Sequence, residues 1–350
     1  MKQSKSKFHE IVILAPISEN KISGPLFSNT LLAKELSDKF NGKIQLISTK
    51  TKKEFCFNSI NVQPANKVKI TRNTILIFTG LYDISIFKLA LKYKCKGGQL
   101  IFSPRGNITK KSLLKSIHKK ILYFPIIYFV LKYSKKIHFL SELEFENSAL
   151  KWLYKSKAIS HPNPILFSEI KNIDRTLQPR DEIKCIFIGR YDIHHKGLDL
   201  LLKFVQKNLS SLKKHKIVFY LYGSNYRKGK EQLSKVIITK SLQDRIKLHD
   251  SITSPKVKNS VILNSDYFVH FSRYEGVPQS VIEAMNYKSK VIITTHCNIT
   301  SQELGKGSIL IRDNKDWNNL VSNIIANKDI LECNHNLKTF SPDSFLKEIQ

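Results

Sequence analysis

Short apolar runs rich in β-branched residues alternate with helical stretches along most of this chain of 350 residues. A first series of such runs lies at residues 11–16, 43–48, 74–80, 99–104 and 136–141. A second series lies at residues 184–189, 217–223, 245–249, 267–272, 290–295 and 308–313. Continuous apolar strands separated by helices are typical of a parallel sheet that is buried on both faces.

The two series indicate two domains. Residues 165–182 carry no strong period and follow Pro162 and Pro164. We therefore predict an N-terminal Rossmann-like domain at 1–168, a linker at 169–182 and a C-terminal Rossmann-like domain at 183–350. The last helix of the chain is free to pack back on the first domain. The expected fold class is α/β, with two doubly wound domains.

The chain is strongly basic, with 58 Lys and Arg against 28 Asp and Glu and a formal net charge of +30. Such a charge ordinarily indicates nucleic acid or an anionic membrane as partner. Only 9 of the basic residues are arginine, the side chain that reads guanine and clamps phosphate with two parallel bonds. This weakens the nucleic-acid interpretation. Lysine excess alongside many Ile and Asn also fits an AT-rich genome, and that explanation stays open.

The charge is unevenly distributed. Residues 1–168 hold 29 basic and 9 acidic side chains, whereas residues 169–350 hold 29 and 19. The richest stretch, 108–136, has eight lysines, no acid and an apolar run at 121–131 that contains Pro125. Lysines flanking an apolar helix face are typical of a segment that lies on anionic lipid. The alternative is a packed core helix with solvated lysines at its ends.

No apolar run reaches the ~18 residues needed to span a bilayer. The amino terminus lacks a small-residue cleavage site, and five scattered cysteines fit reduced thiols. We therefore expect a cytoplasmic protein, peripheral on the inner face of the cytoplasmic membrane.

A pair of cations follows the strand predicted at 184–189, in the stretch GRYDIHHKGLDLLL. Arg190 leaves the strand, and Lys196 precedes Gly197, where a helix is expected to begin. Cations beside a helix amino terminus can hold a diphosphate, because side-chain charge and unpaired backbone N–H groups act on the same anion. The alternative is two solvated side chains. The adjacent His194 and His195 are interpreted as ordinary loop residues.

Two carboxylates lie eight positions apart in SRYEGVPQSVIEAM, after the strand predicted at 267–272. Glu275 falls in the turn, and Gly276-Val277-Pro278 leads to the start of a helix. Glu283 lies on the second turn of that helix, where its oxygens can accept hydrogen bonds from the vicinal hydroxyls of a ribose. An exposed helix glutamate is the alternative.

These two stretches resemble the G-R-x(n)-K-G-x-D and E-G-x-P-x(4)-E-A-M segments of the retaining GT-B glycosyltransferases in glycosyltransferase family 4. Looser agreement comes from Ser23-Gly24-Pro25, HPNPI at 161–165 and SPRGN at 103–107. The last, with SIHKK at 116–120 and HFLSELE at 138–144, resembles a branch of polysaccharide and lipopolysaccharide transferases. The resemblance implies a GT-B fold, in which two Rossmann-like domains face each other across a cleft.

The resemblance also implies roles for individual residues. Arg190 and Lys196 would bind the donor diphosphate and neutralise the leaving group. Glu283 would hold the ribose, and Glu275 would lie by the donor sugar. The turn and helix start beside Glu275 would contact the sugar hydroxyls or the phosphate through the backbone of Gly276, Val277, Pro278 and Gln279.

In the N-terminal domain the resemblance implies that Gly24 lets the backbone approach the diphosphate or the acceptor. Arg105, on the acceptor side, stands where many relatives carry a catalytic-site histidine. Asp250 stands where relatives often have glycine near the nucleotide base, so the base stays open.

The resemblance implies no cofactor and no metal, with a nucleotide-diphosphate sugar as donor substrate. The sequence has no Asp-x-Asp, the pair with which other glycosyltransferases chelate a divalent ion. The expected partners are the nucleotide-sugar donor, a lipid-linked or oligosaccharide acceptor and an anionic membrane surface, with no nucleic acid.

The expected activity is a hexosyltransferase of bacterial surface polysaccharide biosynthesis that retains anomeric configuration. A nucleotide-sugar epimerase or a phosphorylase on the same scaffold is the first alternative. A basic nucleic-acid-binding protein is the second, and it gives the spacing of Glu275 and Glu283 no purpose.

Overall fold

The computed structural model describes residues 8–19, 24–68, 71–114, 121–165, 181–331 and 333–350. The chain divides into two compact units. Unit 1 comprises Met1–Leu166 together with Lys338–Gln350, and unit 2 comprises Phe167–Leu337. The linker predicted at 169–182 lies outside the described residues as far as residue 180.

Unit 1 contains an eight-stranded sheet in the order β3-β4-β2-β1-β5-β6-β7-β8. All neighbours are parallel except β3 and β4, which form an antiparallel hairpin. The strands are β1 (Glu10–Ala15), β2 (Lys43–Ser48), β3 (Phe55–Phe57), β4 (Ile60–Pro64), β5 (Thr74–Phe78), β6 (Gln99–Phe102), β7 (Lys136–Phe139) and β8 (Ala158–Ser160).

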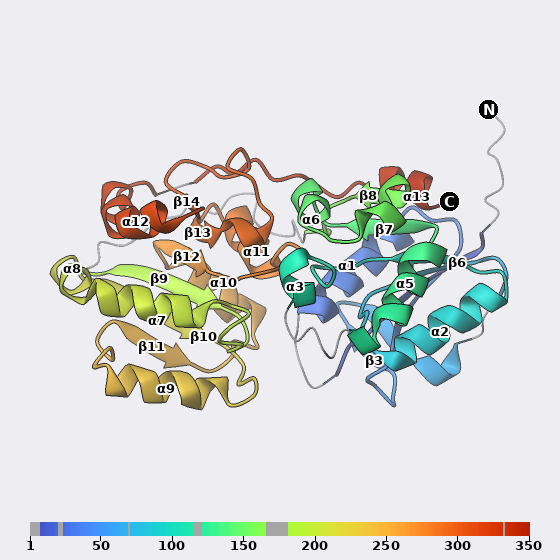
Figure 1. The fold of residues 1–350 in the computed structure, drawn as a ribbon, viewed down its shortest axis with the longest axis horizontal. Helices are drawn as coiled ribbons and strands as arrows, with labels where there is room; N and C mark the ends of the chain where they lie inside the picture. The colour runs from blue at the N-terminus through green and yellow to red at the C-terminus, as the bar shows by residue number, and fades with distance from the viewer. Residues whose placement is uncertain (1–7, 20–23, 69–70, 115–120, 166–180, 332) are drawn as a thin grey trace. The chain divides into compact units, whose positions relative to one another are not determined.

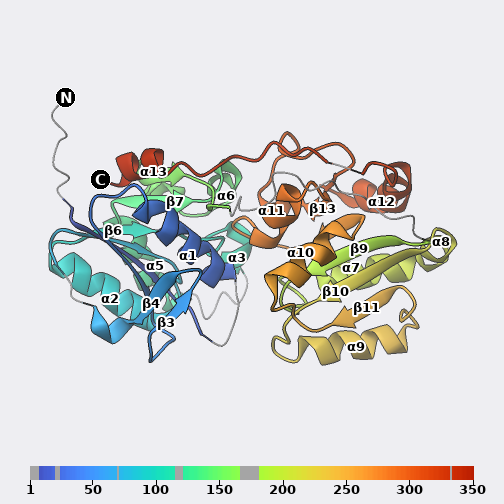
Figure 2. The ribbon, with the colours of Figure 1, turned by 180° about the vertical axis from the view of Figure 1, so that it is seen from behind.

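Side chains of β1 alternate between two apolar clusters, because successive strand residues point to opposite faces. On one face lie α1 (Gly24–Ser37) and α13 (Pro342–Ile349), and on the other lie α2 (Ile84–Cys95) and α5 (Phe124–Tyr133) (Figures 1 and 2). The shorter elements are α3 (Lys110–Leu114), α6 (Glu142–Glu146), η1 (Ala65–Lys67), η2 (Lys151–Leu153) and η3 (Lys155–Lys157). The last helix of the chain thus packs in unit 1.

Unit 2 contains a six-stranded, wholly parallel sheet in the order β11-β10-β9-β12-β13-β14. Its strands are β9 (Ile183–Ile188), β10 (Ile217–Tyr222), β11 (Ile246–His249), β12 (Tyr267–His270), β13 (Lys290–Thr294) and β14 (Ile309–Ile311). Its helical elements are α7 (Leu198–Lys207), α8 (Leu209–Lys214), α9 (Gly229–Thr239), α10 (Pro255–Leu263), α11 (Gln279–Asn286), α12 (Asn314–Ala326) and the turn η4 (Thr295–Cys297).

The sheet of unit 2 is also buried on both faces. Tyr267 and Val269 of β12 enter the cluster that includes α7, α9 and α12, whereas Phe268 enters the cluster that includes α10 and α11. Accordingly, α7 lies in front of the sheet in Figure 1, and α10 lies in front of it in the reverse view of Figure 2. The predicted α/β class with two doubly wound domains is confirmed.

All eleven predicted strands are present, with ends within one to three residues of those expected. Three strands were not predicted: β3, β4 and β8. The first two form a hairpin whose turn residues Asn58 and Ser59 have left-handed φ values of 49° and 62°. These strands are short and lie at or next to the sheet edges, where half-exposed residues give a weak apolar signal.

The lysine-rich stretch 108–136 includes residues 115–120, which lie outside the described residues. Pro125 falls in the first turn of α5, a position that needs no backbone N–H, so it does not break the helix. Ile127, Val130 and Leu131 are buried, whereas Ile121 and Leu122 are 65% and 80% exposed. The apolar run therefore belongs half to the core and half to the surface. Within the described part of the chain, no helix has both the length and the apolar character of a membrane span.

The centre of the unit 2 sheet places two loops side by side. From β9 the chain adds β10 and β11 on one side, then returns to place β12 on the other side of β9. At such a switch point the loops after the two central strands leave in opposite directions and open a crevice at the strands' carboxyl ends. The loops that carry Arg190 and Lys196 and that carry Glu275 are these two.

Candidate functional site

The loop after β9 is held against the end of β12 by Gly197, the residue that caps α7. Its φ of +64° is left-handed, and a Cβ atom at this position would lie 1.9 Å from the carbonyl oxygen of Phe271. Only glycine combines that backbone conformation with so close an approach. Lys196, one residue earlier, is thereby brought to the loop after β12.

Lys196 and Glu275 form an ion pair across the two loops. The Lys196 Nζ donates to Glu275 Oε1 at 2.5 Å, and the two side chains are 15% and 13% exposed. Ser272 Oγ donates to the same oxygen at 2.8 Å, and His270 Nε2 lies 3.4 Å from it. A largely buried carboxylate of this kind is stable only when donors surround it. Here the donors come from the loop after β9, from β12 and from the loop after β12.

The charge of Glu275 is fixed by these neighbours. Burial by itself would raise the pKa of its carboxyl, but the Lys196 ammonium and the His270 hydrogen bond outweigh burial and hold the pKa well below its usual range. All four of these polar contacts, including His195 Nε2 at 3.4 Å, fall on Oε1. Among the described residues Oε2 has no partner, so it is available to accept a hydrogen bond from a hydroxyl.

His270 stays neutral beneath the ion pair. It is 1% exposed and its ring stacks on Phe187, with centroids 5.6 Å apart. Burial, followed by the nearby Lys196 charge, lowers its pKa to about 4. At neutral pH His270 is therefore an uncharged donor that orients Glu275 without competing with Lys196 for its charge.

Arg190 is oriented by three neighbours. Its guanidinium lies 3.2 Å from Asp192 Oδ2 and 2.9 Å from His195 Nδ1, and it covers the ring of Tyr226 at 4.7 Å from the centroid. Burial favours protonation of Asp192, but its contacts with His195 and the Arg190 charge hold its pKa below the usual range. The Arg190 side chain is 43% exposed. It is thus held in place and still open to an anion.

His195 connects the two loops directly. Its Nε2 lies 2.8 Å from the carbonyl oxygen of Tyr274, and its ring stacks on the Tyr274 ring with centroids 4.3 Å apart. A carbonyl only accepts and a guanidinium only donates, so the hydrogen is on Nε2 and the bare Nδ1 accepts from Arg190. This tautomer ties Arg190 to the loop that carries Glu275.

A second ion pair also connects the loops after β9 and β12, whose contact we call the joint. Arg273 donates through both terminal nitrogens to the two oxygens of Asp199, each at 2.6 Å, and also to the carbonyl oxygen of His194 at 2.7 Å. Such a two-pronged contact fixes orientation as well as distance. Asp199 is on the first turn of α7, so the helix that follows Lys196 is anchored to the loop before Glu275.

The turn after Glu275 is held by Asn298, the residue that follows η4. Asn298, 2% exposed, donates to the carbonyl oxygens of Glu275 and Gly276 at 2.8 and 2.7 Å. With both carbonyls engaged, the chain passes through Val277 and Pro278 into α11, which begins at Gln279. The first N–H groups of a helix have no acceptor within the helix and carry its positive pole. This backbone follows directly on the turn that carries Glu275.

Glu283 takes a separate position on α11. Its carboxylate is 15% exposed and forms an ion pair with Lys258 of α10 through Oε2. That oxygen has no hydrogen bond of good geometry within the described part of the chain. The structure therefore brings Arg190, Lys196 and Glu275 together through shared contacts, while Glu283 is paired with a different lysine.

Gly24 and Arg105 lie in unit 1. Gly24 is the exposed first residue of α1, and a Cβ atom there would meet no atom within 4 Å. Arg105 follows β6 with a left-handed φ of 50°, and its guanidinium contacts Ser28 of α1. The two predicted unit 1 residues are therefore connected through α1.

Sequence reasoning missed His195, His270 and Asn298. The two histidines looked like loop and strand residues, and the asparagine lies 23 residues beyond Glu275 in the chain. A usable signal existed only for His195, because it lies between two predicted cations.

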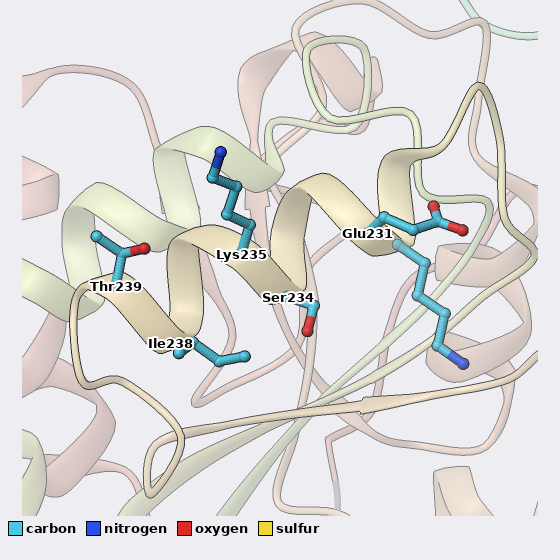
Figure 3. Close-up of a pocket in the computed structure, with 6 residues that line it drawn as sticks. Glu231, Ser234, Lys235, Ile238 and Thr239 are labelled. Atoms are coloured by element: carbon cyan, nitrogen blue, oxygen red, sulfur yellow. The ribbon is translucent and has the colours of Figure 1, made fainter.

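One surface hollow lies away from this joint. Its lining comes entirely from α9, including Glu231, Lys235 and Thr239 (Figure 3). A single helix offers no opposing wall, so this hollow cannot enclose a ligand. We place the functional site at the carboxyl ends of β9 and β12 instead.

Residues 168–339 match the family model described as glycosyl transferases group 1, a range that nearly coincides with unit 2. No curated protein matches the sequence significantly.

Several solved structures are similar in fold. TarM of S. aureus, solved with fondaparinux, alpha-GlcNAc-glycerol and UDP, is 19% identical with a TM-score of 0.60, over 81% of this chain and 56% of TarM. The catalytic domain of starch synthase IV from Arabidopsis thaliana, bound to ADP and acarbose, is 12% identical with a TM-score of 0.67, over 98% of each chain. An α,α-trehalose-phosphate synthase (UDP-forming) from Burkholderia xenovorans is 8% identical with a TM-score of 0.67, over 92% of each.

At these identities the likeness establishes the fold. It is the GT-B architecture of two Rossmann-like domains. The chain spans just over half the length of the TarM structure.

The His195 contacts predict opposite roles for its two nitrogens. His195→Gln keeps a donor for the Tyr274 carbonyl but removes the acceptor for Arg190, whereas His195→Asn keeps an acceptor near Nδ1 and loses the bond to Tyr274. We expect His195→Gln to weaken binding of inorganic pyrophosphate by about three- to tenfold, because Arg190 loses one of its orienting bonds. The affinity is measured by isothermal titration calorimetry.

The Asn variant is the matched control, since both substitutions remove the stacked ring. Its pyrophosphate affinity should stay closer to that of the unaltered chain. Equal losses in both variants would contradict a role of Nδ1 in orienting Arg190.

Proposed function

We propose that this chain, whose residues 168–339 match the model of the glycosyl transferases group 1, is a glycosyltransferase. It moves a sugar from a nucleotide-diphosphate sugar to a hydroxyl of a glycan acceptor, with retention of anomeric configuration. The observation that carries this proposal is the Lys196–Glu275 ion pair at the switch point, with Arg190 held beside it. The UDP and ADP in the TarM and starch synthase structures support a nucleotide donor.

The donor diphosphate is assigned to Arg190 and Lys196. An ammonium group has three N–H donors, and one of them engages Glu275, which leaves two for phosphate oxygens. Arg190 adds a half-exposed guanidinium fixed by Asp192 and His195. Two preorganised cations stabilise the negative charge that develops on the departing nucleotide diphosphate, the role a divalent metal ion fills in other enzymes.

The sugar and ribose are assigned to the carboxylates. Glu275 accepts a hydroxyl of the donor sugar through Oε2, since its Oε1 is engaged by Lys196 and Ser272. The backbone from Gly276 to Gln279 lies at the positive pole of α11 and contacts the sugar or the phosphate. Glu283 is assigned to the ribose hydroxyls, and its carboxylate also pairs with Lys258.

Retention follows from attack on the same face that the leaving group departs. The bond between the anomeric carbon and the phosphate oxygen breaks as the acceptor oxygen bonds to that carbon. The acceptor proton passes to the departing phosphate oxygen, so no protein base is required. Positioning and charge stabilisation then supply most of the rate.

The acceptor is proposed to be lipid-linked, in the synthesis of a bacterial surface polysaccharide. The supporting observation is an exposed apolar set near the lysines of 108–136 in unit 1. It comprises Leu114, Ile121, Leu122 and Phe124, between 46% and 80% exposed. Apolar side chains beside exposed lysines suit an anionic membrane surface. A peripheral position on the inner face of the cytoplasmic membrane would follow.

Lys196→Ala tests the proposed reaction. We expect turnover of the nucleotide sugar to fall by at least about tenfold, because charge on the leaving diphosphate loses one of its two proposed cations. The release of nucleoside diphosphate is measured with saturating donor. Lys196→Ala leaves the largely buried Glu275 carboxylate unpaired, which can destabilise the folded chain. A double variant that adds Glu275→Gln removes this unpaired charge, so loss of activity can be separated from loss of folding. Lys203→Ala, an exposed lysine of α7, should leave turnover unchanged. Full turnover in Lys196→Ala would refute the assignment.

Membrane docking is tested by co-sedimentation with vesicles of phosphatidylglycerol and phosphatidylcholine. The chain should pellet with these vesicles at low salt, and Leu122→Asp should reduce the pelleted fraction severalfold by placing a charge in the apolar set. Ile238→Asp introduces the same charge at a residue of unit 2 that is 60% exposed, and should have no such effect. A chain that stays in the supernatant, or equal effects of the two substitutions, would contradict docking through this apolar set.

A further inference from the structure

Arg105 adopts a strained backbone conformation that the protein holds by a buried carboxylate. Its φ of 50° is left-handed, which for a residue with a Cβ costs on the order of 1 kcal/mol. The fully buried Glu144 accepts from the backbone N–H of Gly106 at 2.5 Å and from that of Leu140 at 2.7 Å. These bonds connect the loop after β6 to the loop after β7. They hold Arg105 in its left-handed conformation, which sets the direction of its side chain.

The guanidinium of Arg105 has only neutral partners. Its NH1 donates to Asn163 Oδ1 at 2.5 Å and to Ser28 Oγ at 3.1 Å. Its Nε is buried and has no hydrogen-bond partner among the described residues. Neither does the guanidinium form an ion pair with any carboxylate in the described part of the chain. Glu144 does not fill this role, because both its oxygens accept from backbone N–H groups.

Burial lowers the pKa of Arg105 to about 10, and the charge of Glu144 offsets only part of that effect. The guanidinium is therefore still charged at neutral pH. His138 adds no charge here, because burial and then the Arg105 cation lower its pKa to about 3. Buried cations in proteins are normally matched by an anion. The charge of Arg105 has no anionic partner among the described residues.

The amino end of α1 lies beside this cation. Ser28, which Arg105 contacts, is one helical turn from Gly24, the first residue of α1. The first turn of α1 has no acidic residue, so its positive pole is not neutralised within the helix. Open space surrounds Gly24 on its Cβ side. Helix pole and guanidinium thus act on the same region.

We propose that Arg105, Asn163 and the amino end of α1 form an anion subsite in unit 1 that binds a phosphate group of the acceptor. A phosphate offers several oxygens to a guanidinium fork and to helix N–H groups at once. The word acceptor rests on the proposed function, whereas the binding of phosphate does not. The proposed function assigns the donor diphosphate to Arg190 and Lys196 in unit 2, and we assign the unit 1 subsite to a second phosphate.

The subsite is tested with inorganic phosphate on the full chain. Titration calorimetry is performed at fixed ionic strength with unit 2 saturated by whichever of UDP, GDP and ADP raises the thermal midpoint most. We expect Arg105→Gln to weaken phosphate binding by at least about tenfold, and Arg105→Lys, which keeps the charge but loses the fork, to weaken it by about threefold or more. Arg72→Gln, at an exposed arginine of the same unit, should bind phosphate like the unaltered chain.

The nucleoside diphosphate affinity of each variant identifies the source of the phosphate. Unchanged affinity in Arg105→Gln, within about twofold, supports the acceptor assignment, because a purely electrostatic contact of the donor would cost more. An equal loss for phosphate and for nucleoside diphosphate would assign Arg105 to the donor and overturn it. Unchanged phosphate binding in both Arg105 variants would show that the arginine only pins Ser28 and Asn163. Neither result would alter the Lys196 test.

Discussion

The ion pair between Lys196 and Glu275 joins the two loops on which the unit 2 site is built. Two charges with little exposure are stable only with further hydrogen bonds, and removal of either partner leaves an uncompensated charge. Ser272 and the neutral His270 provide those bonds on the Glu275 side. The pair therefore fixes the distance between the loops after β9 and β12, and with it the place that we propose for the diphosphate and the sugar.

The surrounding contacts all serve this joint. Gly197 permits the close approach, Arg273 clamps the start of α7, and Asn298 holds the turn that leads to α11. His195 then ties Arg190 to the same frame. Unit 1 has a similar arrangement with a different carboxylate. Glu144 accepts hydrogen bonds from two loops and so fixes the position of Arg105. In both units a buried glutamate at the carboxyl end of a parallel sheet positions a cation.

Much of this arrangement is readable from the sequence. Continuous apolar strands predicted both sheets, and Arg190, Lys196 and Glu275 stood out because each follows such a strand. His270 and Asn298 could not be predicted, since their roles depend on β12 lying between β9 and β13, which no local pattern encodes. The pairing of Glu283 with Lys258 was equally hidden, because it joins two helices. The apolar run at 121–131 was ambiguous for a physical reason: its second half packs in the core and its first half does not.

The most direct test of the central claim is a crystal structure of the full chain with its nucleotide-diphosphate sugar. The account predicts a phosphate oxygen about 2.7–3.2 Å from Lys196 Nζ, with Glu275 Oε1 still bound to that nitrogen and Oε2 accepting from a sugar hydroxyl. A diphosphate bound away from Arg190 and Lys196, or a Glu275 that releases Lys196 and turns from the sugar, would contradict it.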